Sequence, residues 1–399
     1  MAVSLLAHEV SDLCLGKPAL RALSISATIA DALSVLKNSD ENFISVWDCQ
    51  HKLASTGFEG NNDVCECQCV GKVCMVDVIC YLCKDKNLLS PADALKASVS
   101  VLLPKIPGLV MRVEPSCSLL EAIDLMLEGA QNLVVPIKNK LSSRRKQLQK
   151  LSPISPTNHN GREFCWLTQE DVIRFILSSI GLFSPIPALS IDSLGIISTD
   201  VNAVDYHSPA TLALEAISRS LIDQTSLAVV DSDGILIGEI SPLTLGCCDE
   251  TVAAAITTLS AGDLMAYIDC GGPPEYLVRV VKERLKEKGL EGMLEHFNVS
   301  SNLLSYLSTS SSSDDESVVA PKLTRSGKHS RSISYSARMV RRAEAIVGHT
   351  KSSLVAVMIQ ALAHRVNYVW VIEDDSSLVG IVTFSDMLKV FREHLESMA

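Results

Sequence analysis

The fold of this chain is decided by residues 368–386, which read YVWVIEDDSSLVGIVTFSD. Two runs rich in β-branched and aromatic residues, Tyr368–Glu373 and Leu378–Thr383, lie on either side of an acidic turn. This composition is typical of two strands joined by a short loop. A helix with its apolar residues on one face is then expected from Asp386 through His394. The stretch therefore predicts a strand, a second strand and a helix.

The residues before this stretch complete a unit. An extended apolar segment, Ala343–Val347, comes first, and helical spacing of apolar residues runs from Leu354 through Leu362. Ser353 stands where a serine hydroxyl caps the first turn of a helix. The unit therefore reads strand, helix, strand, strand, helix.

The same order recurs three times upstream. The third unit uses residues 203–205, 212–219, 226–231 and 237–241, the second uses 110–113, 118–123, 132–137 and 164–168, and the first uses 28–33, 43–48 and 71–74. Self-similarity of this kind indicates one supersecondary unit used repeatedly. We therefore expect an α/β (α+β) fold built from four β-α-β-β-α repeats.

The four units share a short pattern where the last strand meets the last helix. It reads Cys74-x-x-Asp77, Thr168-x-x-Asp171, Ser241-x-x-Thr244 and Thr383-x-x-Asp386. One interpretation is helix capping, which favours small polar residues and Asp at these places. The other is a shared functional position, because the pattern recurs in register with the two strands before it.

The units resemble CBS domains, in which a strand ending in Gly-h-h-Thr/Ser-x-x-Asp, where h is apolar, opens the final helix. Residues 380–386, GIVTFSD, give the closest match. The whole arrangement, with a cysteine-rich insertion in the first unit, resembles the plant CBS domain-containing proteins of the CBSX type. The resemblance implies that units one and two pair into one Bateman module, and units three and four into a second.

On this basis the chain divides into four repeats and a linker. A helix with one apolar face is expected over Glu275–Phe297, packed on the neighbouring module, ahead of a Ser-rich flexible segment. The predicted boundaries are 15–85 for repeat 1, 109–183 for repeat 2 with a basic insertion at 138–162, 196–268 for repeat 3, 269–336 for the linker and 337–397 for repeat 4.

The resemblance further implies that clefts between paired repeats hold adenosine ligands such as AMP, ADP or ATP, with no required cofactor. A carboxylate accepts hydrogen bonds from both ribose hydroxyls, while a Thr or Ser hydroxyl and the N–H groups of a helix start face phosphate. The predicted nucleotide-binding residues are Thr168, Asp171, Thr383, Ser385, Asp386 and Asp77.

The four junctions are not equally suited to this role. Asp77 is preceded by Cys74, so its junction keeps the ribose acceptor but loses the hydroxyl. Ser241 with Thr244 keeps the hydroxyl and loses the carboxylate. At most two competent clefts are therefore expected.

Two basic residues, His364 and Arg365, precede the strand at Tyr368. A guanidinium makes bidentate contacts with phosphate, which favours a ligand contact. A cation is also favourable at a solvated helix C-terminus, which needs no ligand. Both interpretations stay open.

Composition limits the class of protein. A net charge of −11 argues against nucleic-acid or anionic-membrane binding. The longest apolar runs, such as residues 173–182, are far shorter than the roughly 20 residues that span a bilayer. No basic leader precedes Lys17, and 13 cysteines fit a reducing compartment. We expect a cytoplasmic protein, with the nucleus as a second compartment.

Three further segments carry alternative interpretations. Cys65, Cys67, Cys69 and Cys74 are dense enough for zinc, but their spacing favours ordinary thiols, so no metal is expected. The basic insertion is a solvated loop or a docking patch for an acidic partner. Serines in 308–336 are kinase targets or part of an inert linker.

No nucleophile elbow, Walker loop, Gly-x-Gly-x-x-Gly or His-Glu-x-x-His is present, so we expect no enzyme. The sequence predicts a regulatory adaptor that senses an adenosine nucleotide and modulates a partner protein, a kinase or a metabolic or redox enzyme. One alternative is a γ-type regulatory subunit of an AMP-activated/Snf1-related protein kinase. Another is a ligand-free interaction scaffold. A homodimer is left open.

Overall fold

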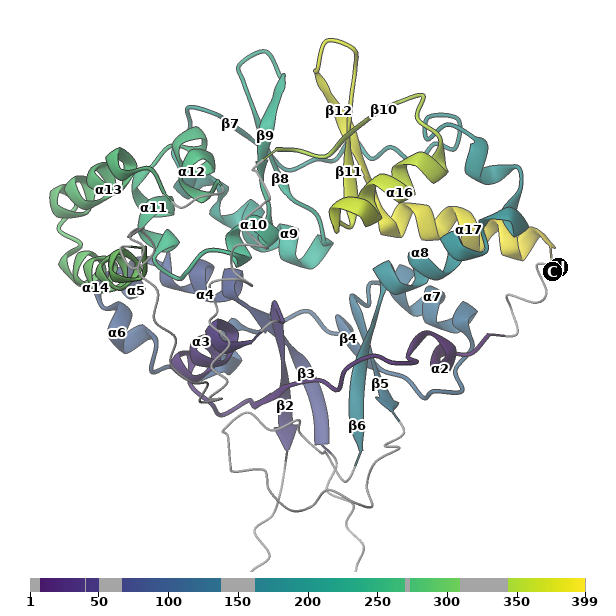
Figure 1. Ribbon diagram of the computed structural model, residues 1–399, viewed down its shortest axis with the longest axis horizontal. Coiled ribbons are helices and arrows are strands. Elements are labelled where there is room, and N and C mark those ends of the chain that lie inside the picture. Colours follow the sequence, from purple (N-terminus) through teal and green to yellow (C-terminus); the bar gives the residue numbers. More distant parts are fainter. Residues whose placement is uncertain are drawn as a thin grey trace, which may run out of the picture.

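The computed structural model describes residues 8–39, 41–49, 67–137, 162–269, 273–308 and 344–398. It contains four three-stranded sheets, β1-β2-β3, β4-β5-β6, β7-β8-β9 and β10-β11-β12 (Figure 1). In every sheet the first strand is parallel to the second, and the second is antiparallel to the third. The expected α/β class and the four repeats are confirmed.

The elements of each repeat follow the predicted order. Repeat 1 holds β1 (Ala22–Ser24), α3 (Ile29–Asn38), β2 (Phe43–Cys49), β3 (Cys67–Cys74) and α4 (Met75–Leu82), and repeat 2 holds β4 (Val110–Arg112), α7 (Leu119–Leu127), β5 (Asn132–Ile137), β6 (Glu163–Thr168) and α8 (Gln169–Ser178). Repeat 3 holds β7 (Ala203–Asp205), α9 (Leu214–Asp223), β8 (Leu227–Val230), β9 (Leu236–Ile240) and α10 (Pro242–Gly246). Repeat 4 holds β10 (Val347–His349), α16 (Leu354–His364), β11 (Tyr368–Ile372), β12 (Leu378–Thr383) and α17 (Phe384–Met398). The outer limits of the repeats stay predictions.

Further helices lie outside this pattern: α2 (Val10–Leu13), α5 (Asp85–Leu89), α6 (Pro91–Ala94), α11 (Val252–Thr258), α12 (Ala261–Ile268), α13 (Glu275–Glu287) and α14 (Glu291–Ser308). None of the helices in the described ranges is both long and apolar enough to cross a bilayer. The basic insertion at 138–161, Cys65 and the Ser-rich residues 309–343 lie outside the described part of the chain.

Local sequence fixes where the helices begin. The hydroxyls of Thr28, Ser118 and Ser353 each accept a hydrogen bond from the backbone N–H three residues later, so the predicted Ser353 cap is confirmed. Such caps satisfy N–H groups that have no partner inside the helix.

The single helix expected over 275–297 is wrong. Gly289 has φ +66°, a left-handed conformation that glycine adopts without strain, and it separates α13 from α14. The second of these helices packs on α5 and α6 beyond repeat 1. At Gly292 a Cβ atom would lie 2.4 Å from the Leu89 carbonyl oxygen, so the contact requires glycine there.

Repeats 1 and 2 form one module, and repeats 3 and 4 form the other. In the first, Trp47 of β2 packs against Phe164 of β6 at a ring distance of 5.0 Å. In the second, a bridge between Ile235 and Ser377 joins the β8–β9 turn of repeat 3 to the β11–β12 turn of repeat 4. A Cβ atom on Gly380 would lie 2.4 Å from the Ser198 carbonyl oxygen, which explains the glycine of the GIVTFSD motif.

The two modules face each other through helices (Figure 1). Helix α4 contacts α9 and α10, and α17 contacts α7 and α8. One buried core combines repeats 1 and 3, and another combines repeats 2 and 4. Arg392 of α17 adds a bidentate pair with Asp124 of α7 at 2.6 and 3.2 Å. Each large core is therefore shared between modules, so their packing and their relative position are coupled.

Each module also begins with a segment that crosses onto its second repeat. The first strap, residues 8–20, is held by the bond from the Val10 N–H to the Cys117 carbonyl (2.9 Å). The second strap, residues 189–198, makes the matching bond from the Ile191 N–H to the Ser352 carbonyl (3.0 Å). The segments that lead into the two modules therefore follow equivalent paths.

Candidate functional site

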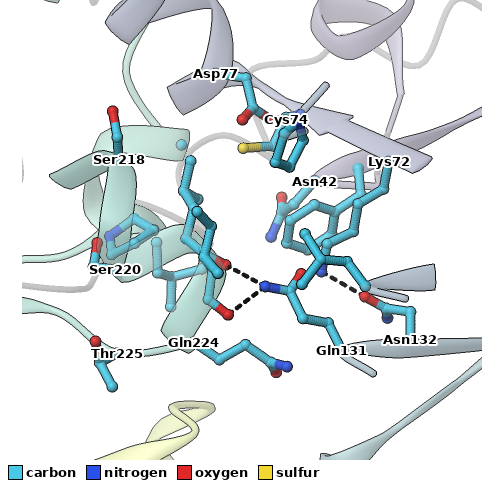
Figure 2. Close-up of a pocket in the computed structure, with 18 of the residues that line it drawn as sticks. Asn42, Lys72, Cys74, Asp77, Gln131, Asn132, Ser218, Ser220, Gln224 and Thr225 are labelled. Carbon is cyan, nitrogen blue, oxygen red and sulfur yellow. Dashed lines mark hydrogen bonds between the residues drawn. The ribbon is translucent and has the colours of Figure 1, made fainter. Parts of the chain in front are cut away.

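A cavity of about 1570 Å³ lies where the four repeats meet (Figure 2). It is called the central cavity below. Its polar lining includes Asn42, Lys72, Cys74 and Asp77 of repeat 1; Gln131, Asn132 and Thr168 of repeat 2; Ser218, Ser220, Gln224, Thr225, Ser241 and Thr244 of repeat 3; and His364, Arg365 and Asn367 of repeat 4. In Figure 2 the side chains of repeats 1 and 2 face those of repeat 3 across the space.

Asp77 brings a carboxylate to this cavity. It lies in the first turn of α4, where its Oδ2 accepts the Cys74 N–H at 2.7 Å. Burial raises the pKa of Asp77, an effect that the Cys74 contacts and Lys72 oppose. A half-buried carboxylate with a second oxygen to offer is suited to accept hydrogen bonds from a ligand that enters the cavity.

Lys72 stands two residues before the same junction, on β3. Its Nζ donates to Asn132 Oδ1 at 2.5 Å, so it crosses from repeat 1 to repeat 2, and it lies 4.8 Å from the centre of the Phe43 ring. Burial lowers the pKa of Lys72 to about 8. The cavity therefore holds an ammonium group that has lost much of its water, and none of the carboxylates in the described ranges forms an ion pair with it.

Lys72→Met is expected to stabilise the ligand-free protein by up to about 3 kcal/mol at pH 7, because it removes a charge whose burial is unfavourable. The unfolded chain keeps the Lys72 proton up to its ordinary pKa of 10.5, whereas the folded chain releases it near pH 8. The free energy of unfolding of the wild type should therefore contain a contribution that rises as the pH increases from about 8 to 10.5. In Lys72→Met this contribution should be absent.

Urea unfolding of both proteins from pH 7 to pH 10 measures this difference. Exposed Lys86 gives the control, since Lys86→Met should change stability by less than about 0.5 kcal/mol. If Lys72→Met has the same free energy of unfolding and the same pH dependence as the wild type, burial of the Lys72 ammonium group does not destabilise the folded protein.

Glu239 occupies the equivalent position in the second module, two residues before Ser241. Both of its carboxylate oxygens accept from the Tyr368 hydroxyl at 2.9 Å, and Oε2 also accepts from Trp370 Nε1 at 2.8 Å. Glu239 is only 3% exposed. The side chains of Glu239, Tyr368 and Trp370 thus fill the space between repeats 3 and 4. At the equivalent position between repeats 1 and 2, Lys72 lines the central cavity.

Sequence reasoning missed both Lys72 and Glu239. The signal was present, because each is a charged residue that directly follows a glycine within its strand, and each precedes its junction by two residues. Their partners, Asn132 and Tyr368, both stand at the start of the second strand of the next repeat. Only the pairing of the sheets shows that these positions match.

Thr168 and Asp171 form a capping box. The Thr168 N–H and hydroxyl both donate to Asp171 Oδ2 at 2.8 Å, and Thr168 lines the central cavity. Lys17 of the first strap forms an ion pair with the same Oδ2 and donates to the Trp166 carbonyl at 2.9 Å. Asp171 is not among the residues that line the central cavity, and its carboxylate is already engaged by three donors.

Thr383 and Asp386 form the same capping box in repeat 4. The Thr383 N–H and hydroxyl donate to Asp386 Oδ2 at 2.9 and 2.6 Å. Thr383 and Ser385 line a second cavity of about 330 Å³, which shares Gln131, Gln224 and Asn367 with the central cavity. Asp386 itself is not among the residues that line it.

The structure therefore brings Asp77 and Thr168 together on the central cavity, and Thr383 and Ser385 together on the second. Gln131 lies between the two spaces and donates to the Leu221 carbonyl at 3.0 Å, which ties repeat 2 to repeat 3. Capping is directly seen at all four junctions, and the ribose role of the carboxylates stays a prediction.

His364 and Arg365 lie at the C-terminal end of α16. Arg365 has φ 56° and caps that helix through its backbone N–H, and both side chains are exposed on the lining of the central cavity. The placement is compatible with a helix-end role and with contact to an anion in the cavity.

No three His, Cys, Asp or Glu side chains in the described ranges are grouped so that they could hold a metal ion. Cys67, Cys69 and Cys74 all belong to β3. Burial raises the pKa of Cys69 to about 12, which makes its thiolate, the form that binds metal, scarce at neutral pH.

Comparisons with known proteins agree with this architecture. A family model described as the CBS domain matches residues 349–393, the greater part of repeat 4. Protein MJ1225 from Methanocaldococcus jannaschii, described as a putative archaeal homologue of γ-AMPK, has a solved structure that matches with a TM-score of 0.54. That match covers 96% of this chain and 100% of that chain at 14% identity, so it shows the fold alone.

Two curated proteins of Arabidopsis thaliana are similar over nearly their whole length. CBS domain-containing protein CBSX5 is 54% identical over 406 residues, which cover 100% of each chain. CBS domain-containing protein CBSX6 is 30% identical over 97% of this chain and 94% of that one. With this identity along its entire length, the chain belongs to the family of CBS domain-containing proteins and is CBSX5-like.

Proposed function

We propose that this protein is a non-catalytic regulatory protein whose central cavity binds an adenosine nucleotide, AMP, ADP or ATP, as a regulatory ligand and not as a required cofactor. The observation that carries this proposal is the central cavity itself, which all four repeats line and which holds both Asp77 and Lys72. CBS domains typically bind adenosine nucleotides.

The chemistry of the lining suits the three parts of such a nucleotide. The carboxylate of Asp77 can accept from a ribose diol, and the cations Lys72 and Arg365 can face phosphate. Val101 and Ile106 line the cavity and are 48% and 47% exposed, so they offer apolar surface to a base. Pockets for small ligands usually measure about 300–1000 Å³, so the space is sufficient.

Binding at this place would couple to the arrangement of the modules. The lining comes from both modules, so a ligand that contacts both favours the packing in which they lie close together. A shift of that equilibrium changes the surface that a partner protein meets. The partner is a kinase or a metabolic or redox enzyme, and neither nucleic acid nor a membrane is part of the proposal.

The other predicted nucleotide-binding residues keep their place in the proposal. Thr168 contributes to the central site together with Asp77. Thr383, Ser385 and Asp386 are proposed contacts for a second nucleotide at the smaller cavity. Asp171 becomes available to a ligand only if Lys17 moves away from it.

We assign the protein to the cytoplasm, with the nucleus as a second compartment, and leave a homodimer open. The γ-type kinase subunit remains an alternative, which a pull-down from native extract tests by whether a kinase catalytic subunit is recovered. The filled space around Glu239 and the Lys17–Asp171 ion pair favour the other alternative, a scaffold without ligand.

Titration calorimetry of the full chain with AMP, ADP, ATP and S-adenosylmethionine tests the proposal. We expect saturable heat with at least one adenosine nucleotide, and a higher thermal midpoint in its presence. Absence of both heat and thermal shift with all four compounds would refute nucleotide binding and leave the scaffold.

A further inference from the structure

The side chain of Gln131 lies where the central cavity meets the second cavity, since it lines both. It is only 6% exposed. Its Nε2 donates to the carbonyl of Leu221 at 3.0 Å and to the carbonyl of Ile222, and both carbonyls belong to the last turn of α9 in repeat 3 (Figure 2). The last four carbonyls of a helix have no donor within the helix, so the Gln131 amide satisfies two groups that α9 itself cannot.

These two contacts fix the direction in which the Gln131 amide faces. Carbonyl oxygens only accept hydrogen bonds, so the pair of carbonyls requires the NH2 group on its side and turns Oε1 the other way. In Figure 2 Oε1 of Gln131 points away from the two carbonyls. Within the described ranges, no group donates a hydrogen bond to this oxygen. Gln131 therefore holds a nearly buried acceptor at the junction of the cavities, and such an acceptor gains most from a donor on a ligand.

Gln224 of repeat 3 brings a donor to the same junction. It also lines both cavities, and its Oε1 accepts a hydrogen bond from Asn367 Nδ2 at 2.8 Å. Because that oxygen is engaged, the NH2 group is the part of the Gln224 amide that is left for a ligand. The junction thus offers an acceptor from one glutamine and a donor from the other.

Apolar surface accompanies this polar pair. Ile106 lines both cavities, and its 47% exposure leaves surface against which a flat ring can lie. The edge of adenine carries a donor, the 6-amino group, beside an acceptor, N1, which is the complement of what the two glutamines offer. A 6-oxo purine has an acceptor at position 6 and a proton on N1. In the same pose, each of its two groups would therefore face a group of its own kind.

We propose that Gln131 is a specificity-determining residue of the central cavity, whose Oε1 accepts a hydrogen bond from the 6-amino group of a purine nucleotide while Gln224 donates to N1. The site thereby selects 6-amino over 6-oxo purines. This inference rests on the proposed nucleotide site and adds to it the residues that choose the base.

The selection depends on contact between the modules. Gln131 belongs to the first module and the carbonyls that orient it belong to α9 of the second. The end of a glutamine side chain rotates easily when no partner holds it. The packing of the modules therefore determines whether the cavity presents a fixed acceptor to the base.

Titration calorimetry of the full chain with AMP and with IMP at pH 7 measures the selection. The two nucleotides share ribose and phosphate and differ only in the group at position 6 and the proton on N1. We expect the wild type to bind AMP about ten-fold or more tightly than IMP. Gln131→Met keeps the length of the side chain but has no amide, so the preference should fall to within about two-fold.

Gln360 provides the matched control. Its Nε2 also donates to a backbone carbonyl, that of Val347 at 2.6 Å, but its side chain lines neither cavity. Gln360→Met should therefore keep the preference of the wild type. Gln224→Met gives a second test that leaves the contacts of Gln131 with α9 in place, and it should lower the preference in the same direction as Gln131→Met.

The outcomes separate this inference from the proposed function. If the wild type binds AMP and IMP equally, the selection by Gln131 is refuted and the nucleotide site stands. Absence of heat with both nucleotides refutes the site and the inference together. If Gln131→Met weakens AMP and IMP by the same factor, Gln131 only holds the modules together and its part in specificity is refuted.

Discussion

Asp77→Asn is expected to lower the affinity for AMP by about ten- to one-hundred-fold, which corresponds to the loss of charge-assisted hydrogen bonds to the ribose hydroxyls. Asparagine keeps an oxygen that can accept the Cys74 N–H, so the start of α4 should remain capped. The expected change is therefore in ligand affinity and not in folding. Titration calorimetry of wild type and variant measures it.

Asp31 provides the matched control. It belongs to the same repeat and forms the same kind of cap, with the Thr28 N–H and hydroxyl bound to its Oδ2 at 3.0 and 2.7 Å, but its carboxylate lies outside the central cavity. Asp31→Asn should leave affinity within about two-fold of wild type. A loss of binding in Asp386→Asn, with Asp77→Asn unaffected, would move the ligand to the junction of repeat 4.

The second large effect is expected at Glu239. Glu239→Ala should destabilise the protein by about 3 kcal/mol, because it leaves the Tyr368 hydroxyl and Trp370 Nε1 buried without their shared acceptor. Glu239→Gln keeps one acceptor oxygen and should lose about half as much. Urea unfolding followed by tryptophan fluorescence measures the change.

Glu215 is the control for this series. It is a glutamate of the same repeat whose side chain is 86% exposed and pairs with Arg219 on the surface of α9. Glu215→Ala should cost less than about 0.5 kcal/mol. Equal midpoints for Glu239→Ala and Glu215→Ala would mean that the polar cluster around Glu239 does not hold repeats 3 and 4 together.

The elements that the sequence predicted well are those in which local pattern and tertiary structure agree. The strand Leu378–Thr383 was predicted to the residue, because an apolar run meets a capping box at one end and an acidic turn at the other. The short strand Ala22–Ser24 was not predicted, since three residues show no periodicity and this strand exists only through its pairing with β2. Cys67–Val70 was treated as a thiol cluster, although it opens β3.

The candidate site was less accessible to sequence reasoning. The Asp positions at the junctions were identified from a local motif, but the central cavity depends on contacts between modules. Lys17 meets Asp171 across 154 positions of sequence, and Tyr368 meets Glu239 across 129. No local pattern reports such pairs, so the sequence could not show which carboxylates are already occupied.

The location of the ligand is tested most directly by a crystal structure of the full chain soaked with AMP. We expect nucleotide density in the central cavity, with the ribose within hydrogen-bonding distance of Asp77 and the phosphate facing Lys72. An empty central cavity beside nucleotide density at the smaller cavity of Thr383 and Ser385 would contradict this account.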